Sequence, residues 1–183
     1  RVPQLSDPTR LPARGTVFGS RLDTIIHSVG AESLVSALRT SEEELGKVPE
    51  RLRDYPERPL VSVIMPTFNR AGIIADAIQS ILEQNYQNWE LFVCDDESTD
   101  NTEEVVAQLG DVRIKYLKLP RRGAAAARNE GLAGARGKII AYLDSDNYWH
   151  PSFLSRMVLA LLDRPGCSAA YSDFIDFEVK RDG

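Results

Sequence analysis

Residues 60–94 read LVSVIMPTFNRAGIIADAIQSILEQNYQNWELFVC, and this stretch decides the fold class. It opens with a mainly apolar run, typical of a strand buried on both faces, which Pro66 ends. Residues 72–84 then repeat isoleucine, alanine and leucine at the spacing of one helical face, and residues 89–94 form a second apolar run. A strand, a helix and a strand in this order predict a βαβ unit with parallel strands.

The same alternation continues along the chain. We expect helices over residues 101–109, 124–135 and 151–162, and strands over residues 112–117 and 138–143, with a fifth strand that begins at residue 168. Strands that alternate with helices predict an α/β fold with a mostly parallel, doubly wound sheet. In such sheets, ligands bind beyond the carboxyl ends of the strands.

Composition narrows the functional class. The chain has 183 residues, 43% of them hydrophobic, and a formal net charge of −5. This balance argues against a nucleic-acid partner bound by phosphate neutralisation. No apolar stretch approaches the 18 or so residues that span a bilayer, and no signal peptide is recognisable. Both cysteines, Cys94 and Cys167, lie in apolar runs, so we expect two buried thiols.

The first 58 residues differ from the rest. We divide the chain into an extension, residues 1–58, and an α/β domain, residues 59–183. Three prolines mark residues 1–16 as an extended or disordered leader, and residues 20–39 carry the spacing of two short amphipathic helices. Residues 41–58 are rich in charge, which indicates either a solvated helix and linker or a docking segment for a partner domain.

Acidic side chains follow two of the expected strands. Asp95 and Asp96 come after residues 89–94, and Asp144 and Asp146 come after residues 138–143. Two aspartates separated by one residue can direct oxygens towards a hard cation such as Mg²⁺ or Mn²⁺, which would bridge diphosphate oxygens. Arg128, or one of the arginines at 121 and 122, could supply a complementary contact. Asp95 and Asp96 also have a simpler interpretation as caps of the loop and the following helix, and a lone D-x-D triplet often arises by chance in loops.

Two segments, VSVIMPTFNRAGIIADAIQSILEQNYQNWELFVCDDESTDNT and GAAAARNEGLAGARGKIIAYLDSDNYWHP, carry a resemblance to a known family. In the order and spacing of their motifs they resemble the family 2 glycosyltransferases, whose nucleotide-binding half has the GT-A fold. The resemblance covers about residues 59–176. It implies a nucleotide-sugar site made of Pro66, Thr67, Phe68, Asn69, Asp96, Arg128, Asp144, Ser145 and Asp146.

The resemblance also implies roles for these residues. The ring of Phe68 would lie near the base, and Asp96 would accept a hydrogen bond from the imide N–H of uracil or thymine. Arg128 would lie near the diphosphate or brace the acidic loop. Asp144 would lie near the ribose or donor sugar, and Asp146, together with Asp144, would hold Mn²⁺ or Mg²⁺.

The implied activity is transfer of a sugar from a nucleoside diphosphate, most simply UDP, to an acceptor hydroxyl with inversion. The acceptor could be a carbohydrate, a lipid-linked sugar or a protein. The family's acceptor-binding half and catalytic base follow the last strand seen here, so we expect the base beyond Gly183. We expect a cytoplasmic donor site, either free or peripheral at the inner face of the membrane. Glu97 stands where the family usually has glycine.

Other functions fit the sequence less well. A non-catalytic module that binds a nucleotide or a protein partner is the main alternative. A phosphoacceptor receiver domain would need an aspartate after the third strand, where Lys118, Leu119 and Pro120 stand. A sugar nucleotidyltransferase would need a glycine-rich loop after the first strand, and residues 66–70 do not provide one.

Overall fold

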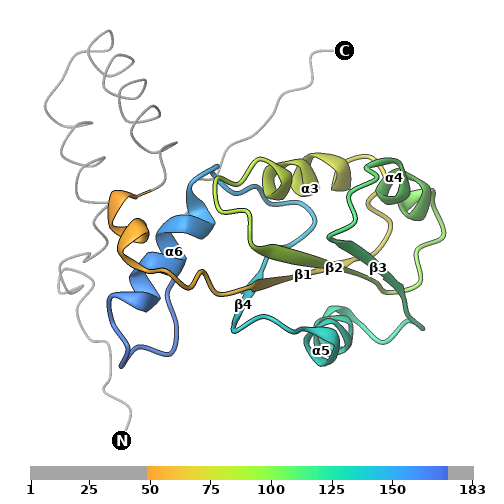
Figure 1. Ribbon diagram of the computed structural model, residues 1–183. Helices are drawn as coiled ribbons and strands as arrows, with labels where there is room; N and C mark the ends of the chain where they lie inside the picture. Colours follow the sequence, from red (N-terminus) through yellow and green to blue (C-terminus); the bar gives the residue numbers. More distant parts are fainter. Residues whose placement is uncertain (1–48, 173–183) are drawn as a thin grey trace, which may run out of the picture. The chain divides into compact units, whose positions relative to one another are not determined.

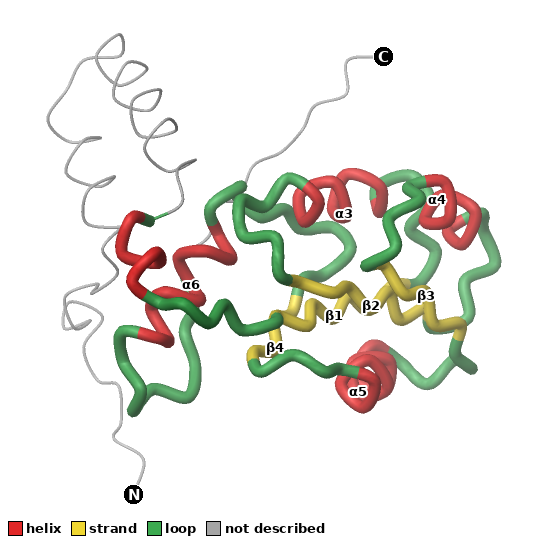
Figure 2. Tube along the Cα trace, viewed as in Figure 1, coloured by secondary structure: helices red, strands yellow, loops and turns green. Residues whose placement is uncertain are grey.

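The structure is a computed structural model that describes residues 49–172. Strands and helices alternate along the chain after a short 3-10 helix, η1 (Glu50–Asp54). The elements are β1 (Val61–Thr67), α3 (Ile74–Leu82), β2 (Trp89–Asp95), α4 (Thr102–Gln108), β3 (Ile114–Lys118), α5 (Ala124–Gly134), β4 (Ile139–Tyr142) and α6 (Phe153–Leu162). This confirms the predicted α/β fold, and Figure 2 shows the alternation directly.

The sheet of the described chain has four strands in the order β3-β2-β1-β4, and every neighbouring pair is parallel. β1 and β2 lie at the centre, and all their residues are buried, which the apolar runs predicted. β3 and β4 lie at the edges and are only partly buried. Thr67 pairs with Asp95 at the carboxyl ends of β1 and β2, so the residues that follow these strands begin side by side.

Helices cover both faces of this sheet (Figure 1). Because side chains alternate along a strand, Val63 of β1 joins the larger core cluster with α3 and α6. The next residue, Ile64, points to the other face, where it packs with Phe92, Cys94 and Ala127 of α5. α3, α4 and α6 on one face and α5 on the other therefore fix the sheet and, with it, the direction in which the strand-end loops leave.

Gly131 allows α5 to approach the sheet closely. A Cβ atom at this position would lie 2.7 Å from the sulfur of Cys94 and 2.8 Å from a methyl carbon of Ile64. No real Cβ approaches other atoms so closely, so only glycine fits here without movement. The position of α5, which carries Arg128, therefore depends on this contact.

Two predictions about this part of the chain are wrong. Residues 168–172 form no strand. Before them, the backbone N–H of Cys167 donates a hydrogen bond of 2.8 Å to the carbonyl of Arg164 in a turn after α6. Cys167 is exposed, whereas Cys94 is buried as expected. Apolar neighbours in sequence favoured burial at both sites, but only Cys94 lies on a central strand. The remainder of the expected fifth strand lies outside the described residues, as do the leader and the helices over residues 20–39.

The end of the charged segment packs against the α/β fold. Leu52 of η1 is fully buried in the larger core cluster. Arg51 forms an ion pair of 2.9 Å with Asp163 at the end of α6, and the Tyr55 hydroxyl donates a hydrogen bond to the same carboxylate at 2.7 Å. Residues 51–55 therefore lie on the α/β fold, while the proposed division at residue 58 stays a prediction.

Candidate functional site

A cavity of about 320 Å³ opens at the carboxyl ends of β1, β2 and β4. Its walls come from the loops after these strands and from the first turns of α5, and it is lined by Pro66, Thr67, Phe68, Arg70, Asp96, Ala124, Arg128, Asp144, Ser145 and Asp146. Eight of the nine residues that the resemblance assigns to the nucleotide-sugar site are in this set. The tertiary structure thus gathers residues from three separate loops at the edge where parallel sheets bind ligands.

Asp96 anchors one wall of the cavity. Its side chain is nearly buried, and Oδ1 accepts a hydrogen bond from the backbone N–H of Arg122 at 2.7 Å. Oδ2 accepts one from the backbone N–H of Gly123 at 2.9 Å. An ionised carboxylate offers about four acceptor positions, so Asp96 can bind this loop and still accept a hydrogen bond from a ligand. The carboxylate therefore fixes the β3–α5 loop as well as facing the cavity.

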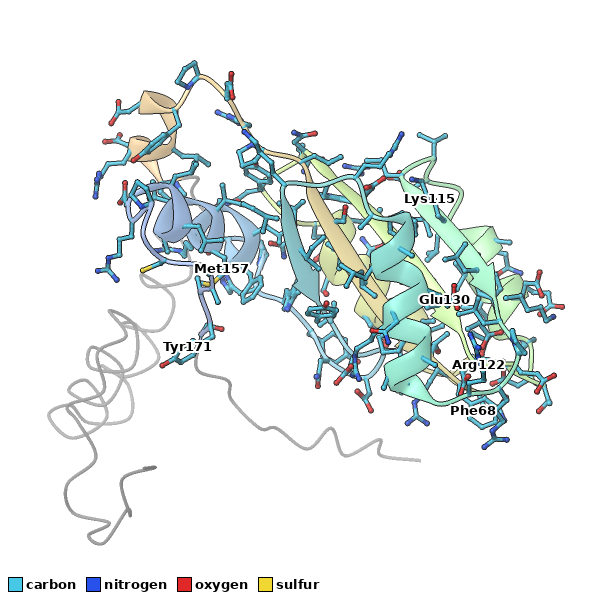
Figure 3. All side chains as sticks on the ribbon, turned by 90° about the horizontal axis from the view of Figure 1, so that it is seen from below. Phe68, Lys115, Arg122, Glu130, Met157 and Tyr171 are labelled. Carbon is cyan, nitrogen blue, oxygen red and sulfur yellow. The ribbon has the colours of Figure 1, made fainter. Side chains whose placement is uncertain are left out.

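The aromatic ring of Phe68 forms another wall of the cavity and contacts the β3–α5 loop. The guanidinium carbon of Arg121 lies 4.0 Å from the centre of the Phe68 ring, within the range of a cation–π contact. Phe68 lines the cavity, whereas Arg121 does not. Figure 3 shows Phe68 and Arg122 together at the end of the sheet where α5 begins, far from Lys115. The two loops thus brace each other around the cavity.

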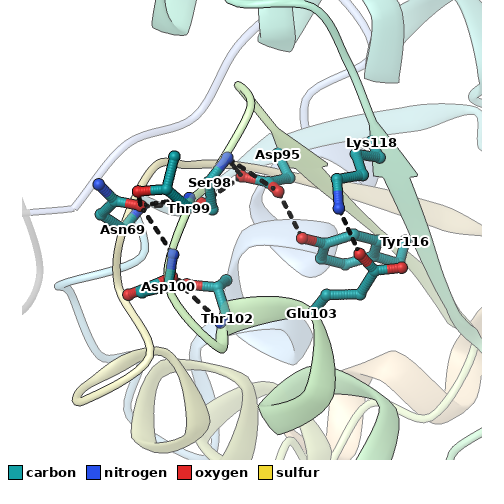
Figure 4. Close-up of polar contacts among 9 residues, drawn as sticks. All are labelled: Asn69, Asp95, Ser98, Thr99, Asp100, Thr102, Glu103, Tyr116 and Lys118. Atoms are coloured by element: carbon teal, nitrogen blue, oxygen red, sulfur yellow. Dashed lines mark hydrogen bonds and ion pairs between the residues drawn. The ribbon is translucent and has the colours of Figure 1, made fainter.

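Asn69 has a different place from its neighbours. It does not line the cavity; its Oδ1 accepts a hydrogen bond from the backbone N–H of Thr99 at 2.8 Å (Figure 4). Its own backbone N–H donates to Oγ of Ser98 at 2.8 Å. With a φ of 52°, Asn69 is in the left-handed region that asparagine tolerates. Asn69 therefore ties the β1–α3 loop to the β2–α4 loop.

Asp95 and Asp100 hold the β2–α4 loop itself (Figure 4). The buried Asp95 accepts hydrogen bonds from the backbone N–H of Ser98 at 3.0 Å and from the hydroxyl of Tyr116 at 2.5 Å. Burial and this hydrogen bond raise the pKa of Tyr116. Asp100 accepts from the Thr102 hydroxyl, which lowers the pKa of its carboxyl group. Both aspartates serve the loop structure, as the capping interpretation of Asp95 predicted.

Glu97 keeps the turn that follows β2. Its φ is 67°, in the left-handed region that favours glycine. Glycine is also the usual residue here in the family that the sequence resembles. A non-glycine residue in this conformation costs roughly 1–2 kcal/mol. The departure from the family pattern therefore leaves the turn, and with it Asp96, in place.

Each carboxylate of the Asp144-Ser145-Asp146 segment faces an arginine. Arg128 of α5 donates a hydrogen bond of 2.5 Å to Asp144, with both side chains partly exposed. Arg70, at the end of the β1 loop, lies 3.8 Å from Asp146. Arg128 thus contacts the acidic loop. Its predicted place near a diphosphate stays a prediction. The sequence did not single out Arg70, although its place directly after the strand-end motif was a usable signal.

Two observations bear on what the cavity could hold. The hydroxyl oxygen of Thr67 is buried and has no hydrogen-bond partner among the described residues, although Thr67 lines the cavity. No group of three or more His, Cys, Asp or Glu side chains in residues 49–172 is arranged to hold a metal. The two carboxylates nevertheless fit a hard cation of the Mg²⁺ type, which is bound through one or two carboxylates together with phosphate oxygens and water.

A second cavity, of about 540 Å³, lies at the opposite end of the strands. It is lined by the segment before β1, the start of β4 and the end of α6: Glu57, Arg58, Pro59, Lys138, Ile139, Leu161 and Leu162. It lies at the amino ends of the parallel strands and contains none of the strand-end aspartates. The smaller cavity is therefore the candidate site.

Comparison with known proteins decides the family. Residues 62–182, more than half of the chain, match the family described as Glycosyl transferase family 2. The chain belongs to this family. WfgD of Escherichia coli, named UDP-Glc:alpha-D-GlcNAc-diphosphoundecaprenol beta-1,3-glucosyltransferase, is 47% identical over 104 residues, which are 56% of this chain and 41% of WfgD. TuaG of Bacillus subtilis, a putative teichuronic acid biosynthesis glycosyltransferase, is 37% identical over 120 residues, which are 64% of this chain and 47% of TuaG.

Solved structures agree with this family 2 assignment. S. aureus TarS in complex with UDP has a TM-score of 0.55 and 28% identity, over 57% of this chain and 32% of TarS. The mannosyltransferase PcManGT from Pyrobaculum calidifontis, in complex with GDP-Man and Mn²⁺, has a TM-score of 0.56 and 30% identity, over 78% of this chain and 45% of PcManGT. The GT-A fold is therefore shown. This family 2 chain spans less than half the length of WfgD and TuaG.

Within residues 49–172, no helix combines the length and apolar character that a membrane span requires.

Proposed function

We propose that the chain is the donor-binding part of a glycosyltransferase that transfers a sugar from UDP to an acceptor hydroxyl with inversion. The convergence of Phe68, Asp96 and the two arginine–aspartate pairs in one strand-end cavity carries this proposal. Family membership and the UDP-glucose donor in the name of WfgD support it.

The base would bind between Phe68 and Asp96. An aromatic ring offers a stacking face, and an acceptor-only carboxylate suits the imide N–H of uracil. The unpartnered hydroxyl of Thr67 lies beside these groups and would gain a hydrogen-bond partner from a bound nucleotide. Three neighbouring groups therefore present the stacking and hydrogen-bonding chemistry of a nucleoside site.

The diphosphate would lie towards Arg128, Asp144 and Asp146. Arg128 can form charge-assisted hydrogen bonds with phosphate oxygens. Asp144 and Asp146 would hold Mn²⁺ or Mg²⁺, and such an ion offsets charge on a diphosphate leaving group. Ser145, buried between the two aspartates, would keep their backbone in place.

The proposed reaction is a single displacement. The acceptor oxygen attacks the anomeric carbon, the bond from that carbon to the diphosphate oxygen breaks, and a carboxylate base takes the hydroxyl proton. We assign the base to no described residue, and Asp173 and Asp176 lie outside residues 49–172. We propose a carbohydrate, lipid-linked or protein acceptor; a lipid-linked one would place the enzyme at the inner face of the membrane.

Calorimetry with the whole chain tests the proposed function. UDP-glucose, UDP-N-acetylglucosamine and GDP-mannose are titrated with and without Mn²⁺, and we expect a UDP-sugar to bind more tightly with Mn²⁺. Absence of binding by all three donors in both conditions would overturn the proposal. Binding without release of UDP, even with acceptors present, would favour the alternative of a non-catalytic nucleotide-binding module.

Asp96→Asn tests the base contact. The change removes the negative charge and one acceptor, so we expect uridine and UDP to lose affinity by similar factors, about tenfold, as for a hydrogen bond to a charged group. Asp76→Asn is the matched control because Asp76 is exposed in the first turn of α3 and does not line the cavity. Equal affinity in Asp96→Asn and wild type would exclude the proposed role.

A further inference from the structure

Arg70 lines the candidate cavity beside the two carboxylates proposed to hold a cation. Its guanidinium lies 3.8 Å from the carboxylate of Asp146, and its side chain is 44% exposed. At this distance the two groups attract each other but do not form a hydrogen bond. Because an exposed pair of this kind contributes little, the Arg70 side chain can leave Asp146 at small cost.

The backbone of Arg70 is fixed although its side chain is exposed. Its N–H donates a hydrogen bond to Oγ1 of Thr102 at 3.0 Å. Its carbonyl accepts hydrogen bonds from the backbone N–H groups of Ile73 at 3.0 Å and Ile74 at 2.9 Å, at the start of α3. The guanidinium can therefore change partner by side-chain rotation alone, with the loop held between α3 and α4.

The two arginine–aspartate pairs differ in strength. Arg128 and Asp144 are 2.5 Å apart and share a charge-assisted hydrogen bond, whereas Arg70 and Asp146 are 3.8 Å apart. A cation that enters alone must compete with both arginines for the carboxylates. A diphosphate offers both arginines other anionic oxygens, and Arg70 has the weaker contact to give up.

We propose that Arg70 couples donor binding to cation binding by exchanging Asp146 for the diphosphate of the nucleotide. The exchange releases Asp146 for the cation, so that each ligand raises the affinity for the other by the same factor. The inference rests on the proposed function, because it assumes that a nucleoside diphosphate enters this cavity. It assigns Arg70 as a positioning residue for Asp146 and as a binding residue for the donor.

Arg70→Gln in the whole chain tests the exchange by calorimetry. Mn²⁺ alone should bind about two- to fivefold more tightly than to wild type, because an exposed ion pair no longer competes for Asp146. UDP without metal should bind about tenfold more weakly, because a charge-assisted contact is lost. Uridine, which has no phosphate, should keep its affinity within about twofold. The factor by which UDP raises Mn²⁺ affinity should fall.

Two further variants sharpen the test. Arg51→Gln makes the same chemical change in an exposed ion pair with Asp163, outside the cavity, and should match wild type in all three titrations. Arg70→Lys retains the charge but not the planar fork, so its UDP affinity should lie between those of wild type and Arg70→Gln. If Arg70→Gln does not fold, as judged by thermal denaturation, the lysine variant carries the test.

Each outcome decides the proposal. If wild type binds UDP, but the Arg70 variants have the same UDP affinity and the same coupling between UDP and Mn²⁺, the exchange is wrong and the proposed function stands. Equal losses for uridine and UDP would also overturn it, because Arg70 would then act on the base pocket. If wild type binds no nucleotide under either condition, both the exchange and the proposed function are wrong.

Discussion

Glu90 of β2 should be a major source of stability at neutral pH. Its side chain is only 5% exposed and accepts hydrogen bonds from Ser62 Oγ and Lys115 Nζ, both at 2.7 Å. It also accepts one from the backbone N–H of Arg136 at 2.9 Å, and Ser62 Oγ in turn accepts from the N–H of Gly137 at 2.8 Å. This network fastens the α5–β4 connection to the sheet.

The size of the effect follows from the pKa of Glu90. Burial alone would raise this pKa, but the hydrogen bonds from Lys115, Arg136 and Ser62 outweigh it and lower the value from 4.5 to about 2. At about 1.4 kcal/mol per pKa unit, ionised Glu90 stabilises the fold by about 3 kcal/mol. Because the folded pKa is the lower one, this stabilisation is complete above pH 4.5 and is lost as the pH falls towards 2.

The assay compares wild type with Glu90→Gln, which resembles the protonated side chain. Urea unfolding followed by circular dichroism should show that the variant is about 3 kcal/mol less stable at pH 7, and that this difference shrinks to about 1.5 kcal/mol at pH 3. Glu104→Gln, in the exposed first turn of α4, should change stability by less than about 0.5 kcal/mol. A gap below about 1 kcal/mol at pH 7, or an equal gap at both pH values, would refute the reasoning.

Three further outcomes are expected. Gly131→Ala should destabilise the fold by about 1–3 kcal/mol, because its Cβ would overlap the sheet, whereas Gly72→Ala, with nothing within 4 Å, should be nearly neutral; urea unfolding compares them. Maleimide at pH 7 should label only Cys167 in the folded chain, because Cys94 is buried and burial raises its thiol pKa to about 11; mass spectrometry counts the labels before and after denaturation. Asp146→Ala should abolish the gain in UDP-sugar affinity that Mn²⁺ gives, measured by calorimetry; an undiminished gain would exclude it as a ligand.

The secondary structure could be predicted because burial leaves a local signature. β1 and β2 are covered on both faces, so their sequences are almost continuously apolar, and α3 shows one clear apolar face. Residues 168–172 show the limit of this signal. Small and apolar residues there resembled a strand, but a strand also needs a neighbouring strand to pair with, and local composition does not report whether one is present.

The candidate site was predicted in composition but not in detail. Asp96, Asp144 and Asp146 could be found because the carboxyl ends of parallel strands meet at one edge of the sheet. Asn69 stands in the same motif as Phe68, yet its side chain binds the 98–100 loop, and it does not line the cavity. The contacts of Asn69 that give it this different role join residues about 30 positions apart in sequence. A local sequence pattern does not report such contacts.

The sequence by itself determined the order of strands and helices and the family, because periodicity and motif order are properties of neighbouring residues. Only the tertiary structure decided which charged groups meet. Glu90 gains its partners from β1, β3 and the α5–β4 connection, and Arg70 faces Asp146 only because β1 and β4 are paired in the sheet. Electrostatic contacts depend on the distance between the groups in space. Groups that are far apart in sequence come close together only when the sheet forms.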